Sequence, residues 1–487
     1  MYSTQALPFD NSFVNSLPET FFQRIKPSPL ESTHLVSFNP SAAALIDLSP
    51  TEQYRAEFIN AFSGLSPLAS MDPIAMVYSG HQFGSYNPQL GDGRGLLLGE
   101  VLNKKQERWD IHLKGAGLTP FSRDGDGRAV LRSTIREYLG SEALHHLGIP
   151  TTRGLCIFGS SELVYREKVE SGASLIRLAQ SHIRFGTFEY FYYTQQHSAL
   201  KTLADYTIQR HFPDALEQPN SYLFFFQQVI QKTAELIAKW QAVGFAHGVM
   251  NTDNMSIIGE TFDFGPFGFL DNFDATYICN HSDYQGRYAF NQQPSIAYWN
   301  CSCLGQALLP LAPVEDIKAA LNKFPEYFFQ CYDRLIRKKL GLFEEKNTDK
   351  DLITELFQLL QDQQPDYTLF FRYLSDYKPN QAHKKLSCLF NDTEQLDAWL
   401  AHYATRLLSE NVNEQQRTNI MKSVNPKYIL RNYLAQVAIE KAEQKDFSEI
   451  DKLLKILSTP YDEQHENEEY AKQAPAWSKT IQVSCSS

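Results

Sequence analysis

The pattern of apolar and polar positions changes near residue 190. Before it, short β-prone runs such as residues 95–101 and 109–114 alternate with Gly-rich turns. Residues 129–147 are the exception, because their apolar side chains recur about every 3.6 residues, the period of an α-helix. This order of elements (strand, turn, strand, charged helix, strand) predicts a small mixed lobe built on an antiparallel sheet.

Helical periodicity dominates the rest of the chain. Residues 222–243 form a long amphipathic run, and Gly244 after it is a usual helix stop. Loops rich in His, Asp, Asn and Gly follow, and beyond residue 313 the pattern is again mostly helical. The predicted fold class is α+β. We predict four parts: an N-terminal segment (1–70), a β-rich lobe (71–190), a larger helical lobe (191–312) and a helical C-terminal region with the tail (313–487).

The composition is that of a folded, acidic protein. The 487 residues exceed the roughly 250–300 that one hydrophobic core accommodates, so more than one core is expected. A net charge of −11 argues against a general nucleic-acid binder, which needs an excess of Lys and Arg. The N-terminus does not resemble a secretory signal, and no run reaches about 18 apolar residues. We expect a cytoplasmic protein outside the membrane, with a monomer as the default.

Cysteine usage favours a reducing compartment. The seven cysteines are sparse and odd in number, which fits the cytosol better than a disulfide scaffold. Cys301 and Cys303 are too close together and too isolated to suggest a zinc site, which usually needs a second cluster at a distance. We interpret both as ordinary buried thiols.

Two glycine-rich stretches are candidates for binding a nucleotide. Residues 89–95 contain Gly91 and Gly93, where backbone N–H groups can approach an anion without a Cβ in the way. Arg94 in the same stretch has a guanidinium that can contact phosphate oxygens. Residues 114–128 form a second charged glycine loop, and we expect the two loops to bracket one strand. Hairpin turns that bind no ligand are the alternative interpretation.

A lysine and a glutamate follow in the order found in protein kinases. Lys114 ends a β-prone run, and Glu137 lies in the predicted helix that comes next. Glycine loop, strand Lys and helix Glu is the order of the small kinase lobe, where the Lys contacts phosphates and the Glu holds it in place. A surface ion pair, worth about 0–1 kcal/mol, is the alternative.

The catalytic and metal loops of kinases also have counterparts here. On the pattern H-R-D-x-x-x-x-N, His247 and Asn254 fall in place, and Asp263 begins the metal-binding D-F-G. Val249 occupies the position of the usual catalytic Asp, and a valine cannot accept a proton. A carboxylate does occur four residues later, at Asp253. Either the chain is a catalytically dead binder, or Asp253 serves a rearranged geometry, as expected if the nucleotide had another orientation.

Longer motifs make the chain resemble the selenoprotein O family. They are residues 78–84 (YSGHQFG), 87–94 (NPQLGDGR), 112–117 (HLKGAG), 121–128 (FSRDGDGR), 247–254 (HGVMNTDN), 263–271 (DFGPFGFLD) and 425–432 (NPKYILRN). The resemblance runs from about residue 22 to the last residues. It implies a kinase-like bilobal fold that binds ATP flipped relative to ordinary kinases. The implied activity is transfer of AMP from ATP to Ser, Thr or Tyr hydroxyls of other proteins.

The resemblance also implies roles for single residues. Asp253 would accept the proton of the attacking hydroxyl, and Asn254 and Asp263 would hold Mg²⁺ or Mn²⁺. Glu137 would hold the lysine. The residues that would contact ATP are Gly91, Gly93, Arg94, Lys114, Asp126, Gly127, Arg177, Arg184 and Asp263.

Arg177 and Arg184 would neutralise the pyrophosphate that leaves. Their spacing of seven residues puts both on one helical face if that stretch is helical. Two surface arginines are the alternative interpretation.

The C-terminal tail carries a further hypothesis. Selenocysteine-bearing members of the family place that residue very near the end, and this chain has Cys485 there. A reversible disulfide with Cys279, just past the metal loop, is the hypothesis, and an unpaired exposed thiol is the alternative.

Three functions stay open at this point. The first is an AMP-transferring enzyme that uses ATP and acts on protein substrates. The second is a pseudokinase scaffold, which Val249 favours and the intact metal and phosphate groups disfavour. The third is a conventional kinase that uses Asp253 as its base.

Overall fold

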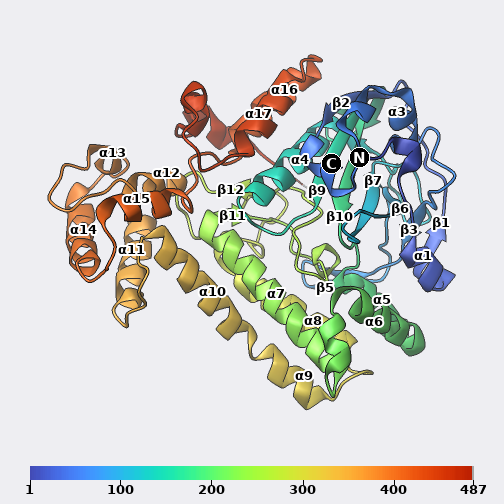
Figure 1. The fold of residues 1–487 in the computed structure, drawn as a ribbon, viewed down its shortest axis with the longest axis horizontal. Helices are drawn as coiled ribbons and strands as arrows, with labels where there is room; N and C mark the ends of the chain where they lie inside the picture. The colour runs from blue at the N-terminus through green and yellow to red at the C-terminus, as the bar shows by residue number, and fades with distance from the viewer. Residues whose placement is uncertain (485–487) are drawn as a thin grey trace.

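The computed structural model describes residues 1–484 and combines one large antiparallel sheet with many helices (Figure 1). The order of the sheet is β1-β3-β6-β7-β10-β9-β2, with β8 paired to β10. This mixed architecture confirms the coarse fold class expected from the sequence. The strands of the sheet are β1 (Phe22–Arg24), β2 (His34–Phe38), β3 (Ile74–Met76), β6 (Gly95–Leu102), β7 (Arg108–Lys114), β8 (Ala129–Val130), β9 (Arg153–Tyr165) and β10 (Val169–Ala179).

The hairpin of β6 and β7 brings the two glycine loops together. Gly95 at the start of β6 pairs with Lys114 at the end of β7. The first loop enters the hairpin and the second leaves it, so both lie at the same end. The expectation that the loops bracket one strand was therefore wrong, because two antiparallel strands separate them in sequence.

Helix α4 (Leu131–His146) lies against the sheet. It begins two residues later than predicted, because Ala129 and Val130 pair with β10 as strand β8. Its apolar side chains, including Ile135 and Leu139, are fully buried. The helix packs on β9 and β10, and its Glu137 reaches Lys114 at the end of β7.

The long helix α7 (Ser221–Val243) was predicted almost to the residue. The Asn220 side chain accepts a hydrogen bond from the Leu223 backbone N–H at its start, and Gly244 ends it in the left-handed conformation with φ of 74°. Helices α8 (Gln293–Ala307) and α10 (Phe324–Lys339) pack along α7 (Figure 1). Two short strand pairs complete the sheets: β4 (Gly80–Gln82) with β5 (Ser85–Asn87), and β11 (Phe245–Ala246) with β12 (Gly268–Phe269).

The C-terminal helices occupy two places. Helices α11 to α15 form a cluster at the left of Figure 1, remote from the large sheet, whereas α16 and α17 return to pack on α4. The apolar core is correspondingly divided into several clusters. None of the helices within residues 1–484 is long and apolar enough to cross a membrane. The remaining α-helices are α1 (Ser12–Ser16), α2 (Pro40–Leu45), α3 (Ala56–Phe62), α5 (Phe185–Tyr193), α6 (His197–His211), α9 (Val314–Leu321), α11 (Asp349–Gln363), α12 (Tyr367–Leu374), α13 (Lys384–Ser387), α14 (Thr393–Leu407), α15 (Glu414–Lys422), α16 (Asn432–Glu443) and α17 (Ser448–Leu457).

Candidate active site

A cavity of about 520 Å³ lies between the glycine loops and the loops that follow α7. It gathers residues that are far apart in the sequence, from strand ends, both glycine loops and the segment after β11. Nearly all the predicted site residues line it: Gly91, Gly93, Arg94, Lys114, Asp126, Gly127, Arg177, Arg184, Asp253, Asn254 and Asp263. The motifs therefore converge on one place in the fold.

The two glycine loops pack tightly on each other. A Cβ on Gly91, which has φ of +109°, would lie 2.5 Å from the ring of Phe121 in the second loop. The Ser122 hydroxyl of the second loop donates to the carbonyl of Gly93 in the first. Within the second loop, a Cβ on Gly127 would lie 2.0 Å from the carbonyl oxygen of Gly117. Glycine is thus required for the loops to meet, in addition to any approach of a ligand.

Lys114 and Glu137 form a buried ion pair below these loops. The Lys114 ammonium donates to the Glu137 carboxylate, and both side chains are almost inaccessible to solvent. The surface-pair alternative was therefore wrong. Burial lowers the pKa of Lys114, and the charge of Glu137 opposes that shift. The second oxygen of Glu137 accepts from Arg177 Nη1 at 3.0 Å.

Arg177 and Arg184 do not lie on one helix, so the condition under which their spacing would put both on one helical face is not met. Arg177 is on strand β10, and Arg184 follows the strand at the N-terminus of α5. The apolar residues around Arg177 are buried on both faces of the sheet, a pattern that periodicity cannot distinguish from a buried helix. Both arginines are buried, with 3% and 2% of their surface exposed, which excludes the surface-arginine alternative.

Asp263 is the point where these cations meet. One carboxylate oxygen accepts from Arg177, and the other accepts from Arg184 Nη1 at 2.6 Å. Burial by itself would raise the pKa of Asp263, but Arg177, Arg184 and Lys114 outweigh it and hold the pKa well below its usual range. The residue has φ of 55°, a conformation that few side chains adopt. Asp263 is therefore a fixed negative charge.

The carboxyl group of Asp253 has a different environment from that of Asp263. Its Oδ2 accepts from Gln82 Nε2 at 3.2 Å, whereas Oδ1 is buried without a hydrogen-bond partner among the described residues. Burial raises the pKa of Asp253 to about 7, and Arg184 and the Gln82 hydrogen bond oppose the rise. Arg184 also donates to the Asp253 backbone carbonyl at 2.6 Å. A carboxyl group with this pKa can take up a proton near neutral pH.

The other loop residues have supporting positions. Asn254 Nδ2 donates to the carbonyl of Val249 at 3.0 Å, which leaves the amide oxygen Oδ1 as the atom suited to a cation. With the Asp263 carboxylate it supplies hard oxygen donors of the kind that Mg²⁺ and Mn²⁺ take. His247 is buried against Trp240 behind the loop and does not line the cavity.

Several cavity residues were missed by reasoning from the sequence. Arg166 bonds both carboxylate oxygens of Asp126, at 2.8 and 2.9 Å, and no local pattern predicts this. The ring of Tyr78 lies 4.2 Å from the Arg184 guanidinium carbon. Tyr78 and Gln82 belong to the motif 78–84, which was noted for the resemblance without a role for either residue.

The charge in the cavity opposes that of the whole chain. Among the described residues, seven basic side chains line it against four acidic ones, although the chain has a net charge of −11. An excess of Lys and Arg beside glycine loops suits a polyphosphate.

Comparison with known proteins decides the family. The sequence model described as "Protein adenylyltransferase SelO" matches residues 4–458. The chain belongs to this family. A protein of Thioalkalivibrio sulfidiphilus is 54% identical over 493 residues, and one of Photobacterium profundum is 53% identical over 516. Both alignments cover 100% of each chain, and both relatives are named "Protein nucleotidyltransferase YdiU". The resemblance noted in the sequence is thus confirmed, and SelO proteins are a family of nucleotidyltransferase enzymes.

The predicted redox pair is described only in part. Cys279 is buried under the loop after β11, where its thiol donates to the carbonyl of Ala246. Cys485 lies outside the described residues. The backbone N–H of His281 donates to the carbonyl of Val483 at 2.9 Å, so the described end of the tail reaches the segment that contains Cys279.

Proposed function

We propose that this chain transfers AMP from ATP to Ser, Thr or Tyr hydroxyls of other proteins and releases pyrophosphate. One observation supports it above the others: a continuous set of ion pairs runs from Lys114 through Glu137 and Arg177 to Asp263, and all of these except Glu137 line the same cavity as Asp253. Such a transfer needs cations that bind the phosphates, an anion that binds a metal ion and a group that accepts a proton. The cavity offers candidates for all three, and the proton acceptor would be Asp253, with a pKa of about 7.

The fold that goes with this proposal is a bilobal kinase-like one. Residues 71–190 would be the small lobe and residues 191–312 the large lobe, with 1–70 and 313–487 as additions. The order of glycine loop, strand Lys114, helix Glu137, loop Asn254 and Asp263 supports this division.

Asp253 would act as the general base. Its unpartnered Oδ1 would take the proton from the acceptor hydroxyl. The hydroxyl oxygen then forms a bond to the α-phosphorus, and the bond from that phosphorus to the bridging oxygen of the β-phosphate breaks. Pyrophosphate leaves with that electron pair. The base thus stands at Asp253 and not at Val249, which fits a nucleotide turned so that its α-phosphate faces the acceptor.

The buried cations would stabilise the leaving group. Lys114, Arg177 and Arg184 are held by Glu137 and Asp263, so their charges are in place before the reaction begins. The glycine loops would supply backbone N–H groups to the same phosphates.

A divalent cation fits the oxygen donors of the site. Asn254 Oδ1 and the Asp263 carboxylate would hold Mg²⁺ or Mn²⁺, because the amide nitrogen of Asn254 is already used as a donor and Asp263 stays ionised. When bound, the cation supplies charge neutralisation at the transferred phosphoryl group.

Labelled ATP tests the proposal directly. The protein is incubated with Mg²⁺ or Mn²⁺ and ATP labelled on the α- or the γ-phosphate, beside Asp263→Ala and the control Asp274→Ala, at a half-buried residue outside the cavity lining. We expect protein-bound label from the α-position only, lost in Asp263→Ala and kept in Asp274→Ala. Label only from the γ-position would make the protein a conventional kinase. No label from either position, with ATP binding retained in calorimetry, would favour the pseudokinase scaffold.

A further inference from the structure

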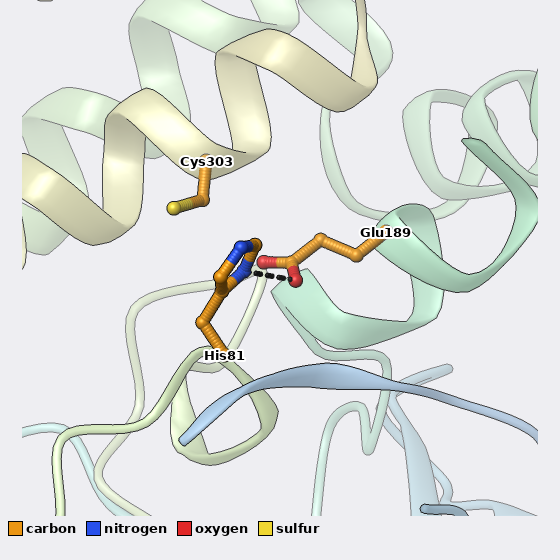
Figure 2. A group of neighbouring side chains, drawn as sticks. All are labelled: His81, Glu189 and Cys303. Atoms are coloured by element: carbon orange, nitrogen blue, oxygen red, sulfur yellow. Dashed lines mark hydrogen bonds and ion pairs between the residues drawn. The ribbon is translucent and has the colours of Figure 1, made fainter. Parts of the chain in front are cut away.

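Three side chains with metal-binding chemistry meet next to the active site. His81 comes from β4, Glu189 from α5 and Cys303 from α8, and Figure 2 shows them pointing toward one another. One ligand atom from each lies within 4.8 Å of the other two. His81 Nδ1 and Glu189 Oε2 are 2.8 Å apart and share a hydrogen bond. The three residues belong to elements far apart in the sequence, so only the fold assembles them.

The Glu189 carboxylate lacks enough partners for its burial. Its side chain is 0% exposed, and His81 interacts with one oxygen only. The other oxygen, Oε1, is buried without a hydrogen-bond partner among the described residues. A buried carboxylate oxygen left unpaired is costly, and a bound cation is one way to satisfy it.

The Cys303 thiol is the third donor. It is 7% exposed, and burial together with the charge of Glu189 raises its pKa well above the usual value, whereas Arg287 opposes the rise. Without a cation the sulfur therefore keeps its proton. A thiol bound to a divalent metal loses it, because the metal outweighs the effect of burial.

We propose that His81, Glu189 and Cys303 bind one divalent transition metal ion, of which Zn²⁺ fits best. One nitrogen, one carboxylate oxygen and one thiolate sulfur are the ligand types of zinc, and three protein ligands with a water is a known form of its tetrahedral shell. Zinc–ligand distances of about 2.0–2.3 Å need ligand atoms roughly 3.3–3.8 Å apart, so small side-chain movements suffice. On binding, the sulfur–hydrogen bond breaks, the sulfur electron pair goes to the metal and the proton goes to solvent.

This site differs from the oxygen site at Asn254 and Asp263. It offers nitrogen and sulfur, which Mg²⁺ does not favour, and its His81 belongs to strand β4 of the β4–β5 hairpin. The backbone N–H of His81 donates to the Thr252 hydroxyl at 2.7 Å, next to Asp253. A metal here would fix the hairpin to α5 and α8 and so support the loop that carries Asp253.

Cobalt spectroscopy and zinc analysis test the proposal on the full chain without ATP. Protein stripped with a chelator is loaded with Zn²⁺ or Co²⁺ alone, in wild type and in Asp263→Asn, which disables the oxygen site. We expect about one tightly held zinc per chain in both, and a near-ultraviolet thiolate-to-cobalt charge-transfer band. An oxygen-only site gives no such band, so bound metal is assigned to one site or the other.

Cysteine variants locate the metal. Cys303→Ser should abolish the band and weaken zinc binding at least about tenfold, whereas Cys301→Ser, which removes a buried thiol from the same helix, should keep both. If circular dichroism shows that Cys303→Ser is unfolded, Glu189→Gln replaces it, with zinc affinity as the readout. Absence of a band in the wild type, or a band that persists in folded Cys303→Ser, would overturn the proposal. So would unchanged zinc affinity in Glu189→Gln.

Discussion

The guanidinium of Arg177 holds the carboxylate of Asp263, although 86 residues separate the two in the chain. The same nitrogen donates to Glu137 on α4 at 3.0 Å. Arg177 therefore links α4, whose Glu137 pairs with Lys114, to the loop of Asp263 that would hold the metal. A phosphate that enters the cavity has to compete with these carboxylates for the arginine. The ion pairs therefore fix the position and orientation of the guanidinium that the phosphate meets.

Replacing Arg177 tests whether this cation acts on the reaction. Arg177→Met should lower kcat by about 10²–10³, the usual cost of a lost charge-stabilising donor. Arg132→Met is the matched control, because Arg132 pairs with Glu170 away from the cavity. Steady-state AMP transfer, with thermal unfolding to confirm the fold, provides the measurement. A kcat within about threefold of wild type would show that Arg177 has only a structural role.

The pH dependence of activity should follow Asp253. Burial raises the pKa of this group to about 7, and only the ionised form can accept a proton. Activity is thus low below this value and should rise as pH increases through about 7. The measurement is kcat/KM for AMP transfer from about pH 5.5 to 8.5, which reports the free enzyme.

Asp253→Asn provides the control for that profile. It should bind ATP but lose transfer at every pH, because an amide accepts no proton at neutral pH. A profile that is flat from about pH 5.5 to 8.5 in the wild type would contradict the role of Asp253.

Gln82 should tune the acidity of the base. Its Nε2 donates to Asp253 Oδ2, and this hydrogen bond lowers the pKa of the carboxyl group. Gln82→Ala removes the bond, so the rising limb of kcat/KM should move to higher pH, with activity recovered on the alkaline side. Gln89→Ala, an exposed residue of the first glycine loop, should leave the limb unchanged. A limb that stays in place or moves to lower pH in Gln82→Ala would refute the assignment.

Glu137 should matter for stability as well as activity. It is the buried partner of both Lys114 and Arg177, so Glu137→Gln leaves two buried cations with less compensation. Removal of one partner from a buried pair costs about 3–5 kcal/mol of unfolding free energy. Glu315→Gln, which breaks an exposed pair with Lys318, should cost less than about 1 kcal/mol. Urea unfolding measures both, and equal effects would contradict the buried role.

The sequence predicted those helices whose ends and apolar face are marked by nearby residues. Helix α7 was predicted within one residue because an amphipathic run and Gly244 mark its extent. The seven-residue spacing of Arg177 and Arg184 could not decide between helix and strand, and Arg177 belongs to a strand buried on both faces. Such a strand has no alternation of apolar and polar positions, and only its pairing with neighbouring strands identifies it.

The site was predictable where residues form motifs and not where the fold alone joins them. Asp253 and Asp263 were found because kinase-like spacing surrounds them. The pair of Asp126 with Arg166 spans two loops and has no sequence pattern. Cys303 was interpreted as an ordinary buried thiol, and it is buried; no sequence pattern could show that His81 and Glu189 lie beside it.

The C-terminal tail yields the last prediction. The described chain ends close to the segment of Cys279, since Val483 bonds to His281 and Cys485 follows two residues later. A reversible disulfide between Cys279 and Cys485 stays a hypothesis, and it requires release of the Cys279 thiol from its buried position.

Oxidised wild type should therefore migrate faster than reduced protein on a denaturing gel, because the closed loop makes the unfolded chain more compact. Cys279→Ser and Cys485→Ser should both abolish the difference, and Cys388→Ser, which removes an exposed thiol, should keep it. Equal migration of oxidised and reduced wild type would end the hypothesis. A shift that persists in Cys485→Ser would assign the oxidation to another cysteine.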